Sequence, residues 1–122
     1  MTAARTFTTV TGSAALSVAT VETGPVTVVH AVGDLDMDTA VLLTRHVDQT
    51  VTAYASVLVV VDLAGLTFLG AAGITALLAV VDRVGRGGGR LRLRGLSPAA
   101  RLALRATGTL SLFDVDGDPP GC

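Results

Sequence analysis

The stretch Val61-Asp-Leu-Ala-Gly-Leu-Thr-Phe-Leu-Gly-Ala-Ala-Gly73 decides how this chain folds. Its first residues continue an apolar run from Val57, which is typical of a buried strand in a parallel sheet. A loop of small residues follows, and then a helix begins. The start of such a helix exposes unpaired backbone N–H groups, a position that suits an anion or a phosphoryl group. Yet the loop, Gly70-Ala-Ala-Gly73, contains no hydroxyl, thiol, carboxylate or amine that could carry a phosphate.

Strands are predicted on both sides of this stretch. Two runs rich in β-branched residues, 15–20 and 26–32, are separated by Glu22-Thr-Gly-Pro25 and predict a hairpin. Residues 57–63 form the apolar strand, which we expect to be covered on both faces. Arginine and leucine alternate strictly over 90–94, which indicates a strand with one solvated face.

Helices are predicted between these strands. Apolar residues at helical spacing predict a first helix that begins near Asp36 or Asp38, with Asp36 as a plausible N-cap. A second helix is expected from about 72 to 85. Ser97-Pro98 opens a third, with Ser as N-cap and Pro at the first helical position, and Gly108 closes it.

The predicted order is therefore β-β-α-β-α-β-α, with a short final element. It predicts an α/β fold, a mixed sheet of four to five strands flanked by helices. A chain of 122 residues suits one domain, which we place at 13–115. We expect a flexible N-terminal segment over 1–12 and a flexible tail over 116–122.

Composition excludes several classes of function. The net charge is −1 and aromatic residues are only 3%, so we expect no nucleic-acid partner. Leu63–Val81 carries no charge, but three glycines and a turn interrupt it, so we expect no membrane span. The single cysteine, Cys122, and an N-terminus without a secretion signal favour a cytoplasmic protein.

No constellation of side chains predicts catalysis or metal binding. The two histidines, His30 and His46, fall in a predicted strand and a predicted helix, with no cysteine beside them. We therefore predict no enzyme, no metal site and no cofactor. The arginines of residues 90–94 form either a solvated rim or a second interface.

Three segments together resemble the STAS domain, the fold of bacterial anti-sigma factor antagonists. Gly33-Asp-Leu-Asp36 with Thr39-Ala40 is similar to the family's Gly-Glu-Leu-Asp-x-x-Thr-Ala helix entry. The segment 61–69 is similar to its Leu-Asp-Leu-Ser-Gly-Val-Thr-Phe-Ile/Leu strand end. Residues 87–108 resemble its last strand and helix. The resemblance covers about residues 14 to 115.

The resemblance implies a protein-binding role. Members dock onto an anti-sigma factor with a histidine-kinase-like ATPase fold and so release a sigma factor. Their loop typically reads Asp-Ser-Ser-Gly, and the partner kinase phosphorylates the second Ser. In this chain Gly70 stands at the Asp, and Ala71 and Ala72 replace the serines, so Ala72 marks a lost phospho-acceptor. We expect no phosphorylation switch there, unless Thr67 or Thr75 substitutes.

We thus predict a module that docks an anti-sigma factor without phosphoregulation and can form a homodimer. Two alternatives stay open: a degenerate STAS scaffold or dimerisation subunit, and a small-ligand or nucleotide sensor at the helix N-terminus. The predicted partner-binding residues are Asp34, Asp36, Leu69, Gly70, Ala71, Ala72, Gly73 and Ile74.

Overall fold

The structure is a computed structural model, and it describes residues 8–12, 15–23, 25–53 and 58–115. The predicted tail over 116–122 therefore lies outside the described residues, as do the first seven residues of the predicted N-terminal segment. The elements are β1 (Thr8–Gly12), β2 (Leu16–Thr23), β3 (Val26–Leu35), α1 (Ala40–Ala53), β4 (Leu58–Leu69), α2 (Ala71–Arg86), β5 (Arg90–Arg94), α3 (Pro98–Ala106) and a 3-10 turn, η1 (Leu110–Leu112).

The strands form one five-stranded sheet in the order β1-β2-β3-β4-β5. The pairs β1–β2 and β2–β3 are antiparallel, whereas β3–β4 and β4–β5 are parallel. The sheet is therefore mixed, and β2 and β3 are the predicted hairpin. The parallel pairs need crossovers, which α1 and α2 supply. The predicted α/β class and element order are confirmed.

The strand predictions were wrong at two places. Residues 8–12, which we expected to be flexible, form β1 and pair with β2, for example Val10 with Ala19. Threonine and valine favour a pleated strand once a partner edge is present. In addition, β4 continues to Leu69, past its predicted end at residue 63, because its last residues pair with the end of β3.

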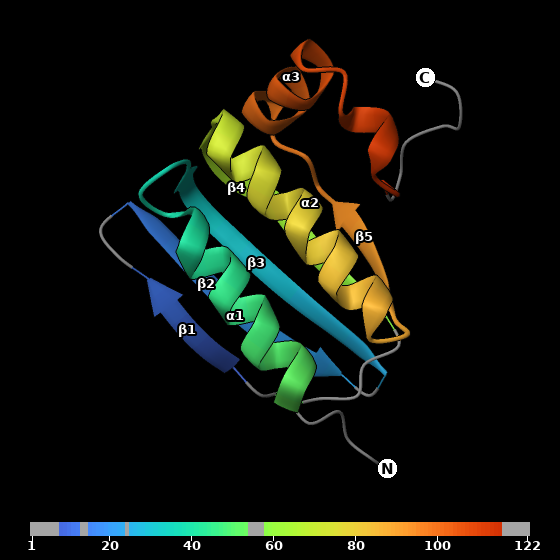
Figure 1. Cartoon of the computed structure of the whole chain (residues 1–122). Coiled ribbons are helices and arrows are strands. Elements are labelled where there is room, and N and C mark those ends of the chain that lie inside the picture. The colour runs from blue at the N-terminus through green and yellow to red at the C-terminus, as the bar shows by residue number, and fades with distance from the viewer. Residues whose placement is uncertain (1–7, 13–14, 24, 54–57, 116–122) are drawn as a thin grey trace.

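The helices α1 and α2 lie side by side on one face of the sheet (Figure 1). Both begin at the edge where β3 and β4 end, and both run back along the strands (Figure 1). The second and third helices match their predictions: α2 spans Ala71–Arg86, and Ser97 Oγ caps α3 by accepting the Ala100 N–H at 3.1 Å. Gly108 follows α3 with φ 71°, as expected of the residue that closes a helix.

The core lies between the sheet and the helices. Alternate residues of β3 and β4 point into it, and α1 and α2 cover them with the Leu, Val and Ile side chains of their inner faces. Residues 59–61 of β4 are all buried, as expected for a central strand. The fully buried large side chains are Leu16, Leu35, Leu43, Leu63, Leu77, Leu93, Leu104, His46, Val18, Val29, Val47 and Val59.

One member of this core is polar. His46 of α1 is 2% exposed and shares a hydrogen bond through Nε2 with the hydroxyl of Thr20 on β2. Burial lowers the pKa of His46 below its ordinary value of 6.5, because the charged imidazolium would lose its hydration. The unfolded chain therefore takes up a proton before the folded chain does as the pH falls.

We predict that this histidine makes stability depend on pH. The contribution of neutral His46 to the free energy of unfolding is fully present above the unfolded-state pKa of 6.5. It is lost as the pH falls from 6.5 through the lower pKa of the folded state. Urea unfolding between about pH 8 and pH 5 should show the decline in the free energy of unfolding. His46→Gln should flatten it, and His30→Gln, which removes the other histidine, is the matched control. An equal slope in the wild type and in His46→Gln would contradict the prediction.

Candidate functional site

The candidate site lies where β3 and β4 end together. Their parallel register places Leu35 beside Leu69, and the Gly70 N–H donates to the Leu35 carbonyl at 2.9 Å. The β3–α1 loop and the start of α2 therefore lie next to each other (Figure 1). We call residues 34–39 and 67–72 the tip.

Gly33 sets the direction in which the chain enters the tip. Its φ of 116° is a conformation that side chains rarely adopt, and a Cβ here would lie 2.1 Å from the Ala15 carbonyl oxygen. This close approach lets the Asp34 N–H donate to the same oxygen at 2.8 Å. The glycine of the Gly-Asp-Leu-Asp motif thus anchors the tip to the start of β2.

Thr39 holds the β3–α1 loop together. Its hydroxyl accepts the Asp36 N–H at 3.0 Å and donates to the Asp34 carbonyl at 2.8 Å, and the residue is 5% exposed. The helix α1 then begins at Ala40, so the predicted start near Asp36 or Asp38 was too early. The backbone carbonyl of Asp36 accepts the Ala40 N–H at 2.8 Å and so joins the loop to the first turn of α1. The side-chain hydrogen bonds of this turn therefore come from Thr39, and not from Asp36, which was the predicted N-cap.

The carboxylates of the loop lie against the end of β4 and the start of α2. Asp34 accepts a hydrogen bond from the Thr67 hydroxyl at 2.7 Å. The Asp36 carboxyl lies against Gly70, the N-cap residue of α2. The tip thus brings together both acids and the start of α2, as the sequence analysis expected.

Three of the predicted contact residues point away from solvent. Leu69 and Ile74 belong to the hydrophobic core, and Gly73 is buried with its Cα against the Leu35 carbonyl. The prediction that these three residues belong to an exposed contact surface was wrong: Leu69 points into the core from the end of β4, and the helical period turns positions 73 and 74 toward the sheet. Ala71 and Asp34 are exposed, and Gly70, Ala72 and Asp36 are half-buried, so the accessible part of the predicted surface is 70–72 with the two acids.

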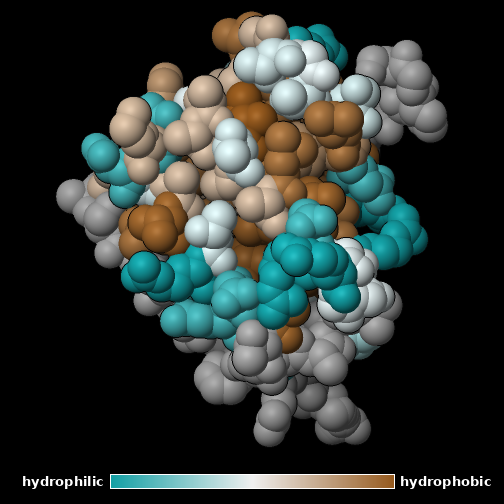
Figure 2. All heavy atoms as spheres, viewed as in Figure 1, coloured by the Kyte–Doolittle hydropathy of each residue, from teal (hydrophilic) through white to brown (hydrophobic). Residues whose placement is uncertain are grey.

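Two exposed apolar side chains of the tip were not predicted from the sequence. Met37 is 78% exposed in the loop, and Phe68 is 49% exposed beside Asp34 in the β3–β4 register. Figure 2 shows apolar residues gathered over the part of the helix face where α2 begins, while hydrophilic residues cover the C-terminal halves of both helices. The sequence did contain a signal for Met37: an apolar residue between two aspartates, Asp36 and Asp38, is expected to be exposed with them.

The tip is also negatively charged. Asp34, Asp36 and Asp38 have no ion pair with any arginine of the described residues. The arginine pairs of the described chain are made elsewhere: Arg83–Asp48, Arg86–Asp82, Arg90–Asp114, Arg92–Asp114 and Arg94–Asp62. Among the described residues these carboxylates have no cationic partner, although that of Asp34 accepts the Thr67 hydroxyl and that of Asp36 lies against Gly70.

The arginines of β5 belong to a separate charged cluster. Arg94 donates to Asp62 at 3.0 Å, and His30 Nδ1 lies 3.3 Å from the same carboxylate. Partial burial alone would raise the pKa of Asp62, but the Ala64 N–H and the Arg94 guanidinium outweigh it, so the pKa lies below its ordinary value. His46, on the buried face of α1, instead bonds Thr20 of β2. No group of three potential metal ligands occurs among the described residues.

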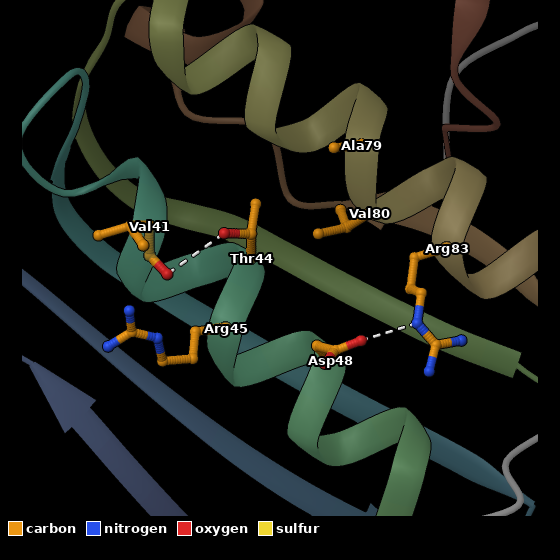
Figure 3. A pocket seen from close by; sticks show the side chains of 7 residues that line it. All are labelled: Val41, Thr44, Arg45, Asp48, Ala79, Val80 and Arg83. Atoms are coloured by element: carbon orange, nitrogen blue, oxygen red, sulfur yellow. Dashed lines mark hydrogen bonds and ion pairs between the residues drawn. The ribbon is translucent and has the colours of Figure 1, made fainter.

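A hollow of about 400 Å³ lies between the first half of α1 and the second half of α2 (Figure 3). Val41 and Thr44 face Ala79 and Val80 across it, and the Asp48–Arg83 ion pair, 2.7 Å long, bridges the two helices. The predicted ligand position at the start of α2 lies outside this hollow, because the residues of the tip do not line it.

Comparison with known families decides the classification. The STAS domain family matches residues 17–118, most of the chain. The chain belongs to the STAS domain family. A search of curated proteins finds no match. Among the described residues, no helix has both the length and the apolar character needed to cross a membrane.

Solved structures agree with this assignment. An anti-sigma factor antagonist from Mycobacterium paratuberculosis is similar with a TM-score of 0.68 at 25% identity, over 93% of this chain and 87% of that one. The unphosphorylated anti-sigma factor antagonist SpoIIAA has a TM-score of 0.65 at 15% identity, over 92% and 90%. A variant of RsbS from Moorella thermoacetica has a TM-score of 0.69 at 18% identity, over 84% and 87%. At 15% and 18% identity, SpoIIAA and the RsbS variant share the fold of this chain.

We predict that the Thr39 hydroxyl is needed for the stability of the tip. Thr39→Val keeps the shape but removes both hydrogen bonds, and it should lower the free energy of unfolding by about 1–3 kcal/mol. Thr39→Ser, which keeps the hydroxyl, should recover most of the loss. Urea denaturation measures both, and equal stabilities of the Val and Ser variants would contradict this role.

Proposed function

We propose that this STAS domain is a regulatory docking module that binds an anti-sigma factor through its tip and is not switched by phosphorylation at Ala72. We further propose that the partner has a histidine-kinase-like ATPase fold, that this chain has no catalytic activity, and that it acts in the cytoplasm. Membership in the family supports a regulatory role.

The observation that carries this proposal is the composition of the exposed start of α2. Ala71 is exposed and Ala72 half-buried at the start of α2, and the same tip carries the exposed Met37 and Phe68. Met and Phe are enriched at the centres of protein interfaces, and the small alanines leave the start of α2 open to close contact. The unpaired carboxylates at the border would select a partner with basic residues, since charge complementarity sets specificity and association rate.

The two threonines near the tip are poor substitutes for the missing serine. The Thr67 hydroxyl donates to the Asp34 carboxylate, so a phosphate there would meet a like charge and break the bond. The Thr75 hydroxyl donates to the Ala71 carbonyl at 3.1 Å within α2. A phosphoryl group adds roughly −1.5 to −2 charges, and Ala72 has no atom to carry it. We therefore propose a tip that is always competent to dock.

We predict that Ala72→Asp weakens docking. An acid in the first turn of a helix is favourable for folding, so the variant should fold, while its charge enters the contact. Affinity for purified candidate anti-sigma factors of the same genome should fall about tenfold or more, equal to about 1.4 kcal/mol. Ala79→Asp, on the same helix but outside the tip, is the control. Unchanged affinity in Ala72→Asp would remove the tip from the interface, and the lack of any such partner would favour a scaffold or dimerisation role.

We also predict that the wild type takes up no label from radioactive ATP and the partner kinase, and that the complex survives ATP. Phosphorylation is measured by autoradiography and by intact mass. Label that disappears in Thr67→Ala or in Thr75→Ala would show that the acceptor has moved to that threonine.

A further inference from the structure

The two edges of the sheet differ in how they are protected against another strand. The outer strands are β1 and β5. An edge strand presents a row of backbone N–H and C=O groups to which a second chain can add a strand, and proteins prevent this with charged side chains, proline, bulges or a covering segment. Each edge of this sheet can be compared with that set of devices.

The β5 edge has two of these devices. Arginines alternate along the strand at positions 90, 92 and 94, and residues 114–115 lie along its outer side. The Leu93 N–H donates to the Asp114 carbonyl at 2.8 Å, and Leu93 forms a parallel bridge with Val115. The Asp114 carboxylate in turn accepts from Arg90 and Arg92. This edge is therefore closed by charge and by the chain itself.

The β1 edge has no charge, proline or bulge. Its residues, Thr8–Gly12, are three threonines, a valine and a glycine. All five residues pair with β2 without a shift of register, whereas the β3–β4 register shifts twice. Within the described part of the chain, β2 is the only strand beside β1. Because an antiparallel strand directs the backbone groups of alternate residues to opposite sides, the outward groups of β1 have no strand partner there.

The sequence of β1 is complementary to itself. Thr9-Val10-Thr11 reads the same in both directions, so an antiparallel pair centred on Val10 places Val10 opposite Val10 and each Thr9 opposite a Thr11. Such β-branched residues favour strands, and Thr–Thr pairs across strands are favourable. A two-fold interface requires a surface of this self-complementary kind. We propose that two copies of this chain pair through β1 and join their sheets into one continuous sheet.

This pairing leaves both tips accessible. β1 and β3 run in the same direction, because each is antiparallel to β2. The tip therefore lies at the end of the sheet where β1 ends, and the antiparallel second copy has its tip at the opposite end. The dimer presents two tips that point in opposite directions. It goes beyond the docking role proposed above and does not require it.

Sedimentation velocity over a series of protein concentrations tests the dimer. The weight-average mass should rise toward twice that of one chain. Val10→Lys sets two like charges opposite each other at the two-fold axis and should raise the dimer dissociation constant about tenfold or more. Ser17→Lys adds the same charge at an exposed residue of β2, which is not an edge strand, and should change it much less. Circular dichroism and thermal unfolding confirm that each variant folds.

Cross-linking tests the register without adding a charge. Cα atoms of directly opposite antiparallel residues lie about 4.5–5.5 Å apart, within the range of a disulfide. In a Cys122→Ser background, which removes the one native cysteine, Val10→Cys should form a covalent dimer under mild oxidation, measured by non-reducing electrophoresis. Ser17→Cys should form it much more slowly, because two positions on β2 would be about 14 Å apart, three strand spacings.

Several results would overturn the proposal. One is a wild-type chain that stays monomeric at every concentration, and another is a dimer that is equally stable in folded Val10→Lys. Loss of the dimer in Ser17→Lys alone, or equally fast cross-linking of both cysteine variants, would place the contact away from β1. None of these measurements includes an anti-sigma factor, so the dimer can fail while Ala72→Asp still weakens docking, and docking can fail while the dimer forms.

Discussion

The parallel pairing of β3 with β4 is the constraint on which the rest of this structure depends. It ends both strands at one edge, with Leu35 beside Leu69, and the Gly70 N–H bonds the Leu35 carbonyl across the pair. Because the helices that follow start at that edge, an acidic loop and a small, uncharged helix start become neighbours. A shift of the register would separate Asp36 from Gly70, so the two halves of the tip would no longer be neighbours, although every strand and helix could still form.

The tip combines a rigid frame with a chemically inert surface. Buried hydrogen bonds of Thr39 and the close approach of Gly33 to β2 fix the backbone, while alanines and exposed apolar side chains form the outer face. The net charge of −1 conceals a segregation of charge: within the described part of the chain the acids of the tip have no arginine partners, whereas the arginines of β5 pair with Asp62 and Asp114 elsewhere. This arrangement suits recognition of a basic partner surface.

Much of the fold could be predicted because local patterns determine local structure. The alternating residues 90–94 became β5, and Ser97-Pro98 opened α3, since each signal depends only on adjacent residues. The misses were non-local. The threonine-rich residues 8–12 form a strand only because β2 offers an edge, and β4 extends to Leu69 only because β3 continues beside it.

For the candidate site, the sequence by itself determined that the loop at Gly70–Gly73 has no phospho-acceptor, and its motifs identified the family. Only the tertiary structure decided which residues are available to a partner: Leu69 and Ile74 are in the core, while Met37 and Phe68 are exposed. It also decided that the carboxyl of Asp36 lies against Gly70 at the start of α2. The physical reason is that residue types set what chemistry is possible, whereas strand register and packing set which distant side chains meet.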